Sequence, residues 1–529
     1  MVASPYPPSR IVHTEYGSVQ GRRLVYEGER QVDAFQGIPF AAPPIGELRF
    51  RKPMPPDPWN GVRQTTAFAA RCIQHPKNPQ DYSINGIPSE NSLYLNVFTP
   101  CWEAPPGGFP VMVFIHGGLY LNGETKSYGD IGICENIVSR GIVFVTIQYR
   151  LGYLGFLSTG DVVCPGNFGL WDQVEALKWV QQNIGAFGGN KHAVTLVGQS
   201  AGAASVDLLH LSPHSTDLFH KAICMAGSAE CRWALHPEME AQTRQKAKRM
   251  GVQYDTNEEL LAKLRQLPAV EFGTGLFSQV KGDHLDMETG PCLDGDFFPE
   301  SLDALRKRAK PKPFLVGVTQ EEGLFAMAGR TSSATGLADT LKDATAECVN
   351  REAMKASLRS HFVGYACPTN PSYIRAQAGM MSDALFVAGV AEHCRKTVAI
   401  QNEPVFLYVF EHFTPEIMGY FTPLLPFHSA THTCELFYLF KKGVLGEPPM
   451  TETERKVMDT FTTALTNFAK YGDPNGADAT ATDLPTRWDP ITKQNPQLNY
   501  VITSGEPTMS DELFEGRTED FIDIRDKYK

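Results

Sequence analysis

A buried strand that ends in a glycine-flanked serine constrains this chain more than any other feature. Residues 193–197 form an apolar, β-branched run of strand length, and Gly198-Gln199-Ser200-Ala201-Gly202 follows at once. Small and apolar residues then continue as a helix. A serine between glycines, after a strand and before a helix, is typical of a sharp turn that holds a nucleophile at the top of a sheet. The five-residue pattern alone would also fit an ordinary small-residue turn, but its setting favours a catalytic serine.

The segments around this turn predict an α/β fold with a large central, mostly parallel twisted sheet. Helix 171–184 carries apolar residues at helical spacing just before the serine strand. Strands and helices in alternation indicate a parallel sheet with helices on both faces. Other largely apolar strands are expected at 110–115, 141–149, 313–318 and 404–410. More polar helical segments are expected as cap insertions at 238–250, 258–266 and 339–362.

The composition predicts one folded domain. The chain has 529 residues, of which 42% are hydrophobic, so it can bury a large core. Its 46 glycines and 38 prolines do not gather into a linker between two halves. Residues 1–10 are rich in proline and are expected to be a disordered lead-in. Residues 11–529 are expected to form a single domain.

Charge and composition argue against several partners. The net charge of −11 disfavours nucleic acid, since phosphate backbones are bound by basic surfaces. No run approaches the roughly 18–20 apolar residues of a membrane span, and the N-terminus lacks the apolar core of a signal peptide. The 11 cysteines show no CxxC spacing, so no metal site or cofactor is expected. A cytoplasmic protein with reduced thiols is the simplest expectation, and the sequence leaves the oligomeric state open.

A serine nucleophile needs a base, and the base needs an acid that orients it. In folds with this nucleophile turn, the acid and then the histidine follow the serine along the chain. Glu322, in the loop after strand 313–318, is the candidate acid, and its neighbour Glu321 is an equal rival on residue type alone. His428 and His432 are the candidate bases, and their spacing does not decide between them.

Ester or amide chemistry at serine also needs hydrogen-bond donors for the oxyanion. Strand 110–115 runs into a loop with paired glycines, which allow the backbone to approach a substrate closely. We expect the N–H groups of Gly117, Gly118 and Leu119, with that of Ala201, to form the oxyanion hole. Taken by itself, this loop is equally compatible with a turn that merely ends a strand.

The order of these features resembles the type-B carboxylesterase/lipase family, the cholinesterase-like branch of the α/β-hydrolases. The likeness extends from about Thr14 to the end of the chain. It rests on ten motifs in order: 35–50 (FQGIPFAAPPIGELRF), 58–61 (PWNG), 89–96 (SENSLYLN), 114–118 (FIHGG), 167–173 (NFGLWDQ), 187–190 (FGGN), 198–202 (GQSAG), 294–299 (DGDFFP), 322–323 (EG) and 432–436 (HTCEL).

The resemblance implies an α/β-hydrolase fold and hydrolysis of carboxylic esters through an acyl-enzyme. It assigns the triad to Ser200, Glu322 and His432, because the family's acid directly precedes a glycine and its base lies three residues before Glu-Leu. Ser228 matches a buried family serine near the histidine. A small-molecule ester is the implied substrate, with no metal or organic cofactor.

Two departures from the family pattern lie beside the serine. Leu119 stands where a third glycine is usual, and leucine resists some conformations that glycine allows. Its side chain could also crowd the acyl group. Gln199 replaces the common glutamate and removes a negative charge next to the nucleophile, a form that resembles juvenile-hormone-type esterases.

Two further departures concern the compartment and the substrate. Cys72 matches a family disulfide cysteine, but its partner position is Ser92, and a second family pair is Val252 and Lys263 here. The loss of both disulfides favours a reducing compartment. The tryptophan that cholinesterases use as a platform for choline has no counterpart in segment 73–91, which argues against a cholinesterase.

The sequence therefore predicts an intracellular carboxylesterase of invertebrate type, acting on neutral or lipophilic esters. The alternative from another class is a non-catalytic, cholinesterase-like interaction protein, because the family includes such members. A third hypothesis keeps the enzyme but narrows its substrate to one hormone or lipid ester.

Overall fold

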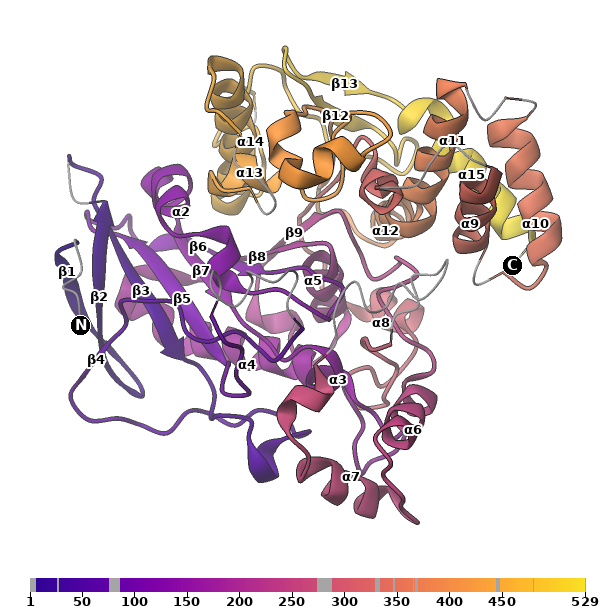
Figure 1. Ribbon diagram of the computed structural model, residues 1–529. Coiled ribbons are helices and arrows are strands. Elements are labelled where there is room, and N and C mark those ends of the chain that lie inside the picture. Colours follow the sequence, from indigo (N-terminus) through magenta and orange to yellow (C-terminus); the bar gives the residue numbers. More distant parts are fainter. Residues whose placement is uncertain are drawn as a thin grey trace. The chain divides into compact units, whose positions relative to one another are not determined.

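The computed structural model describes residues 6–25, 28–75, 86–273, 288–328, 334–345, 348–364, 366, 370–443, 448–478 and 480–528. These residues form two units (Figure 1). The first unit is drawn from residues 1–222, 233–279 and 287–310, and the second from residues 223–232, 280–286 and 311–529. Ser200 belongs to the first unit, whereas Glu322 and His432 belong to the second.

The first unit contains a mixed array of strands. They are β1 (Pro8–Thr14), β2 (Gly17–Val25), β3 (Val32–Pro39), β4 (Val62–Gln64), β5 (Tyr94–Pro100), β6 (Phe109–Ile115), β7 (Val143–Ile147) and β8 (Gly189–Gln199). Their order is β1-β2-β3-β5-β7-β6-β8, with β4 beside β2. Strand β6 is parallel to β7 and β8, as expected. The pairs β1–β2, β2–β3, β3–β5 and β5–β7 are antiparallel. A short turn after Thr14 joins β1 to β2, and such a connection permits only antiparallel pairing.

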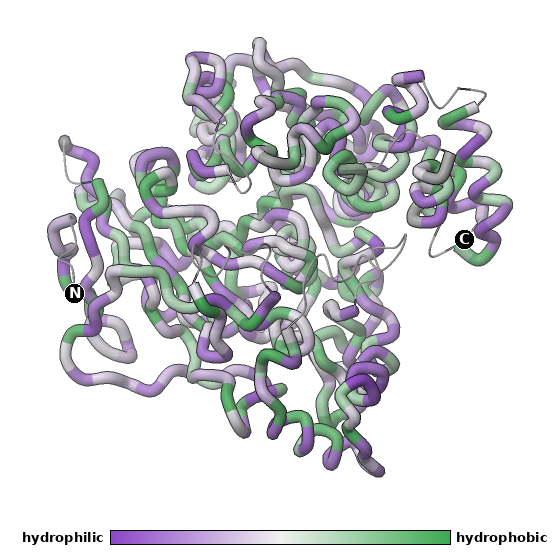
Figure 2. The backbone as a smooth tube through the Cα atoms, viewed as in Figure 1, coloured by the Kyte–Doolittle hydropathy of each residue, from purple (hydrophilic) through white to green (hydrophobic). Residues whose placement is uncertain are grey.

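Helices connect the parallel strands of this unit. The helices are α2 (Ile131–Asn136), α3 (Gly152–Phe156), α4 (Phe168–Asn183), α5 (Ala201–Leu211), α6 (Met239–Arg249), α7 (Asn257–Arg265) and α8 (Leu302–Arg308). Every residue of β7 and all but one residue of β6 are buried, so both faces of these strands are covered. Figure 2 shows helix α6, by contrast, as a largely hydrophilic segment.

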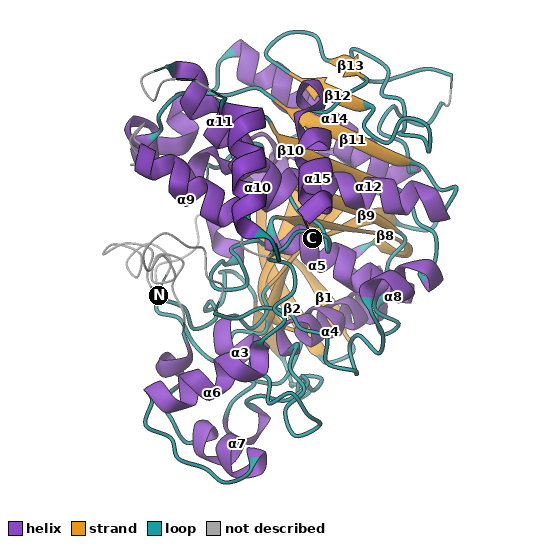
Figure 3. Ribbon diagram, turned by 90° about the vertical axis from the view of Figure 1, so that its right-hand side faces the viewer, coloured by secondary structure: helices purple, strands orange, loops and turns teal. Residues whose placement is uncertain are grey.

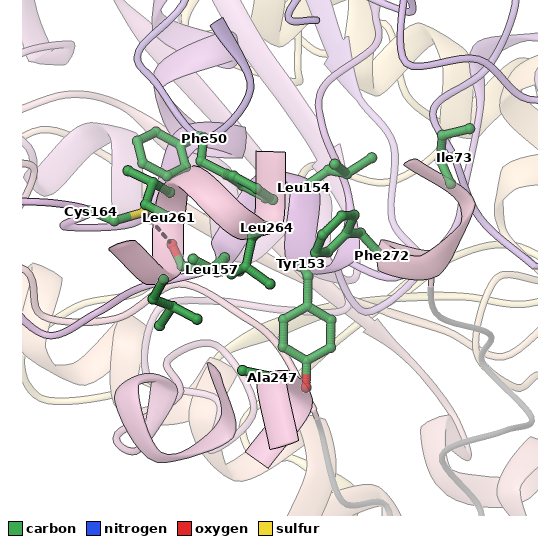
Figure 4. Close-up of a cluster of buried hydrophobic side chains, with 12 residues drawn as sticks. Phe50, Ile73, Tyr153, Leu154, Leu157, Cys164, Ala247, Leu261, Leu264 and Phe272 are labelled. Atoms are coloured by element: carbon green, nitrogen blue, oxygen red, sulfur yellow. Dashed lines mark hydrogen bonds between the residues drawn. The ribbon is translucent and has the colours of Figure 1, made fainter. Parts of the chain in front are cut away.

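A satellite cluster of apolar side chains holds the helical insertion 239–272 in place (Figure 4). Figure 3 shows the helices of this region, α3, α6 and α7, at one end of the first unit. Helix α3 contributes Tyr153 and Leu154, and α7 contributes Leu261 and Leu264. Each of these helices is too short to be stable alone in water, so this burial is what maintains them. The segment is therefore a packed insertion of the first unit, in agreement with the expected polar helices at 238–250 and 258–266.

The second unit has its own parallel strands. They are β10 (Phe314–Thr319), β11 (Val405–Phe410) and β12 (Asn499–Ile502), with β13 (Thr508–Ser510) antiparallel to β12, and β9 (Lys221–Met225) contributes its last three residues to this unit. All residues of β10 and β11 are buried. The helices are α9 (Ala334–Ala344), α10 (Arg351–Leu358), α11 (Pro371–Ser382), α12 (Ala388–Ile400), α13 (Leu436–Phe440), α14 (Glu452–Tyr471) and α15 (Arg517–Tyr528).

Several element boundaries differ from those expected. Strand β1 begins at Pro8, within the expected lead-in, and pairs with β2 from that residue on, while residues 1–5 lie outside the described residues. The helical segment expected at 339–362 consists of α9, α10 and a π-helical turn. Apolar residues at helical spacing in the sequence predict a helix over 457–471. Helix α14 starts five residues earlier, because Thr451 caps it and accepts a hydrogen bond from the N–H of Glu454.

Candidate active site

Ser200 lies on a strained turn between strand β8 and helix α5. Its backbone angles are φ 58° and ψ −125°, outside the regions that residues with a side chain usually occupy. Such a conformation costs about 1–3 kcal/mol and persists only where the surrounding structure enforces it. The side chain is buried, at 4% exposure. The sequence prediction of a sharp strand–turn–helix at this serine is therefore confirmed in its geometry.

The two glycines beside Ser200 allow the turn to pack against its neighbours. A Cβ atom on Gly198 would lie 2.2 Å from the carbonyl oxygen of Gly202, and one on Gly202 would lie 2.0 Å from the carbonyl oxygen of Ile115. Both distances are far shorter than any contact between such atoms. No larger residue fits at either position, so the glycines are what permit the elbow.

Helix α5 begins directly after the serine. Ser200 is its N-cap residue, and the carbonyl of Ser200 accepts the hydrogen bond from the N–H of Ala204 at 3.0 Å. The N–H groups of the first turn have no partner within the helix, and the helix dipole adds a partial positive charge there. The backbone N–H of Ala201 is thus in the part of the helix best suited to stabilise an anion.

The glycine loop 116–119 lies beside the serine in the same unit. A Cβ atom on Gly117 would lie 2.9 Å from the Cβ of Ser200 and 3.0 Å from Oε1 of Gln199. The loop is held from behind by Tyr149, whose hydroxyl donates to the carbonyl of His116 at 2.9 Å. The first unit therefore brings Ser200, Gln199 and the glycine loop together.

Leu119 adopts the backbone conformation that glycine would adopt. Gly118, Leu119 and Tyr120 have consecutive positive φ angles of 113°, 54° and 60°. The carbonyl of Gly118 accepts hydrogen bonds from the N–H groups of Leu121 and Asn122, both at 3.0 Å, which closes this tight loop. Leucine at position 119 therefore keeps the positive φ angle that glycine favours. This left-handed conformation costs about 1–2 kcal/mol for a residue with a side chain.

Leu119→Gly is expected to change kcat by less than threefold, because the backbone already has the conformation that glycine favours. The variant is expected to be less stable than wild type, since it loses a buried side chain, but relief of the left-handed strain offsets part of this loss. Leu121→Gly is the matched control, since Leu121 is buried in the same loop without a positive φ. Thermal midpoints should place Leu119→Gly above this control. A gain in kcat of tenfold or more would instead mean that the leucine side chain obstructs the substrate.

In the second unit, Glu322 and His432 form a buried pair. Nδ1 of His432 lies 2.6 Å from Oε2 of Glu322, the histidine is 8% exposed and the glutamate is fully buried. The other carboxylate oxygen of Glu322 accepts a hydrogen bond from the N–H of Thr319, the last residue of β10, at 2.6 Å. The carboxylate therefore fixes the orientation of the imidazole.

The structure pairs these two residues and places their rivals elsewhere. Glu321 is turned toward Ser382 and Arg517, with distances of 3.3 Å and 3.7 Å to its carboxylate, and burial raises its pKa. His428 is exposed and contacts the ring of Phe413, with the ring centres 5.9 Å apart.

Two aromatic rings flank the imidazole of His432. The ring centres of Phe386 and Phe325 lie 4.3 Å and 5.3 Å from that of the histidine. Phe325 is three residues beyond Glu322, and its N–H donates to the hydroxyl of Thr431 at 3.0 Å, next to the histidine. The loops of the acid and the base are thus joined by backbone as well as by their side chains.

Glu435 is a buried carboxyl group beside this pair that the sequence prediction did not single out. Its side chain is fully buried, and neither of its oxygens has a hydrogen-bond partner among the described residues. Burial, and next the charge of Glu322, raise its pKa well above the ordinary value. The signal in the sequence was a lone glutamate before the aromatic and apolar run 436–440.

The two remaining candidate residues, Gln199 and Ser228, are both buried. Gln199 is buried next to the glycine loop, as described above. Ser228 is buried too, but its hydroxyl donates to the carbonyl of Gly389 at 2.9 Å and accepts from the N–H of Glu230 at 3.2 Å. Its hydrogen bonds thus connect it to the start of helix α12. Segment 73–91 contains no tryptophan that could bind choline, and its residues 76–85 lie outside the described residues.

No group of three or more histidine, cysteine, aspartate or glutamate side chains suited to a metal ion occurs among the described residues. None of the described helices is both long and apolar enough to cross a membrane.

Comparison with known proteins decides the family. Residues 8–519 match the model of the carboxylesterase family. The chain belongs to the carboxylesterase family. Among its relatives, the esterase cest-33 of Caenorhabditis elegans is 37% identical over 92% of this chain and 89% of its own length. The medium-chain fatty acyl-CoA hydrolase precursor of Anas platyrhynchos is 35% identical over 88% of this chain and 85% of its own length. Neuroligin-3 of Mus musculus is 30% identical over 89% of this chain and 63% of its own length.

Membership of the carboxylesterase family confirms three expectations. The chain has the α/β-hydrolase fold, with a mixed array of strands and covering helices. It is a carboxylic ester hydrolase, as its esterase relatives indicate. Its substrates are small-molecule esters.

Proposed function

We propose that this carboxylesterase cleaves its substrate through an acyl-enzyme formed on Ser200. The observation that carries the proposal is the strained turn of Ser200, with φ 58°, between glycines that no other residue could replace. Backbone strain of this kind gathers at functional sites, because stability alone would remove it. The buried pair of His432 and Glu322 supplies the base and the orienting acid that a serine hydroxyl needs.

The proposed reaction has two halves. The hydroxyl oxygen of Ser200 attacks the ester carbonyl, and Nε2 of His432 takes up the hydroxyl proton. The tetrahedral intermediate then collapses, the C–O bond to the alcohol breaks, and the alcohol leaves with the proton from His432. Water repeats the sequence on the acyl-enzyme: its oxygen attacks the acyl carbon while His432 removes one of its protons. The carbonyl then re-forms, the bond between the acyl carbon and Oγ of Ser200 breaks, and Ser200 takes the proton from His432 as the carboxylic acid departs.

The negative oxygen of each intermediate needs donors that are already in place. We propose the N–H of Ala201, at the start of α5, and the N–H groups of Gly117, Gly118 and Leu119. The contact of the glycine loop with Ser200 supports this role, as does the glycine-like conformation of Leu119. Glu322 keeps its charge close to the imidazole and stabilises the imidazolium that forms during each half of the reaction.

We propose neutral or lipophilic esters as the substrates. Gln199 brings no charge to the nucleophile, and Leu119 adds an apolar side chain to the same loop. The relative named as a medium-chain fatty acyl-CoA hydrolase is compatible with an apolar acyl group. Turnover of short- and medium-chain nitrophenyl esters, with preference for the longer chain, is the expected result. A narrow preference for one hormone or lipid ester would appear as weak turnover of the whole nitrophenyl series.

Labelling with an organophosphate tests the nucleophile. Mass spectrometry should find one adduct, on the peptide that contains Ser200, and its formation should parallel the loss of nitrophenyl ester turnover. The Ser200→Ala variant should neither label nor turn over. Absence of both labelling and turnover in the folded wild type would favour the non-catalytic alternative, which the similarity to neuroligin-3 keeps in view.

We also propose a cytoplasmic location. No disulfide joins any two of the ten cysteines among the described residues, and all but Cys101 are buried. Burial raises the pKa of Cys72, one of the family's disulfide positions, to about 11, so this thiol is unreactive at neutral pH. The lack of disulfides among these ten cysteines supports a reducing compartment.

A further inference from the structure

The π-helical turn Asp383–Val387 contacts the base His432, and Ser382, directly before the turn, contacts the residue that follows the acid Glu322. It lies between helices α11 and α12, which it joins without a break in helical direction. A π turn widens a helix by one residue and is uncommon, and such turns occur frequently at functional sites. Together with Ser382, the last residue of α11, the turn brings three side chains within five positions to three different partners in the second unit.

The first side chain, Ser382, supports the residue after the acid. Its hydroxyl oxygen accepts a hydrogen bond from the N–H of Gly323 at 2.9 Å, and the hydroxyl donates to the carbonyl of Ala378 at 2.7 Å. A Cβ atom on Gly323 would lie 2.5 Å from the backbone nitrogen of Ser382. The backbone directly after Glu322 is therefore pressed against the end of α11.

The second side chain, Asp383, connects the turn to the C-terminal helix. Its fully buried carboxylate accepts a hydrogen bond from Nε of Arg517 at 2.8 Å and one from the hydroxyl of Thr518 at 2.7 Å. Nη1 of Arg517 also lies 3.7 Å from the carboxylate of Glu321, next to the candidate acid. The start of α15 thus contacts the turn and the acid loop at once.

The third side chain, Phe386, contacts the base. Its ring centre lies 4.3 Å from that of His432, closer than the other flanking ring. Its carbonyl oxygen is in turn 3.6 Å from the thiol of Cys231, so the backbone here is held on its far side as well.

We propose that the π-helical turn, anchored by Arg517, holds Glu322 and His432 in their reactive arrangement, with Ser382, Phe386 and Arg517 as positioning residues. This inference rests on the proposed function, in which Glu322 and His432 serve Ser200. It assigns the C-terminal helix α15 a role in catalysis although none of its residues takes part in the chemistry.

Paired variants on helix α15 test the proposal. Arg517→Met removes the contacts to Asp383 and Glu321. Arg525→Met is the matched control, because Arg525 lies on the same helix, has a side chain as exposed as that of Arg517 (18% and 19%) and forms an ion pair with Glu392 at 2.7 Å. Both variants are expected to lower the thermal midpoint. Arg517→Met is expected to lower kcat for a nitrophenyl ester 10- to 100-fold with KM within twofold, Arg525→Met is expected to keep kcat within twofold, and Arg517→Lys should recover part of the loss.

The proposal would be overturned if Arg517→Met and Arg525→Met lowered the thermal midpoint together and left kcat alike. Should Arg517→Met fail to fold, Ser382→Ala gives the answer, because it removes the acceptor for the N–H of Gly323 while Arg517 still faces the carboxylates of Asp383 and Glu321. We expect a 5- to 20-fold loss in kcat with KM unchanged, and an unchanged kcat would reject the role of the turn. Absence of Ser200-dependent turnover in wild type would reject the proposed function itself, a result that these variants cannot mimic.

Discussion

Replacing Glu322 by glutamine is expected to lower kcat by about 10⁴-fold, the loss seen when the acid of a serine triad becomes its amide. The amide has nearly the same shape, so the buried site is filled as before. It cannot stabilise an imidazolium, however, and its NH2 group can face Nδ1 of His432 and favour the wrong tautomer. KM is expected to change little, because Glu322 has no contact with bulk solvent or, in the proposed mechanism, with substrate.

Glu321→Gln is the matched control for this prediction. The two glutamates are adjacent and both are buried, yet only Glu322 is hydrogen-bonded to His432. We expect Glu321→Gln to lower kcat less than tenfold, through its weaker contact with Arg517. Both variants should be assayed on one nitrophenyl ester, with circular dichroism to verify the fold. Equal losses in the two variants, or a larger loss at Glu321, would contradict the assignment of the acid.

The nucleophile turn was predictable because its signal is local. A strand, a five-residue pattern and a helix lie consecutively in the sequence. The structure adds the steric reason for the glycines at 198 and 202, where a Cβ atom would clash with backbone oxygens. The acid was not predictable from residue type, since Glu321 and Glu322 share one loop. What separates them is the end of β10 at Thr319, whose N–H binds Glu322, and a bridge between Glu321 and Thr431 that turns the neighbouring side chain away.

Features that depend on contacts between residues far apart in the sequence could not be predicted from it. The split of segment 339–362 and the π turn at 383–387 arise from packing between helices, which leaves no periodic signal of its own. Leu119 was recognised as a departure, but its left-handed conformation is enforced by the hydrogen bonds that close the loop on Gly118. Glu435 belongs to the sequence motif HTCEL at 432–436, but only the fold shows that its carboxyl group is buried.

Glu435→Gln is expected to make the protein progressively more stable than wild type as the pH rises. In the folded state burial, and next the charge of Glu322, raise the pKa of the Glu435 carboxyl well above the ordinary value. In the unfolded chain it titrates near the ordinary pKa of about 4.3. The folded state therefore binds more protons than the unfolded state, and the contribution of this group to stability, complete below about pH 4, is lost as the pH rises toward its folded pKa.

Glutamine is neutral in both states and removes this dependence. The stability of the variant relative to wild type should thus grow by about 1.4 kcal/mol for each pH unit above the unfolded pKa, until the folded pKa is reached. Thermal midpoints of both proteins at pH 5, 6, 7 and 8, at one scan rate, measure the difference. Glu506→Gln, at an exposed position, is the control and should run parallel to wild type.

A pH-independent difference for Glu435→Gln would mean that Glu435 is ionised in the folded protein. The consequence for catalysis would be direct. Glu322 would then have a second negative charge beside it, and the removal of either carboxylate would leave the other to stabilise the imidazolium. A neutral Glu435 instead leaves Glu322 as the carboxylate hydrogen-bonded to the base, which is why the loss expected for Glu322→Gln is so large. The pH series on Glu435 and the kcat of Glu322→Gln are therefore two independent tests of one arrangement, in which Glu435 is neutral and Glu322 is the carboxylate that stabilises the imidazolium of His432.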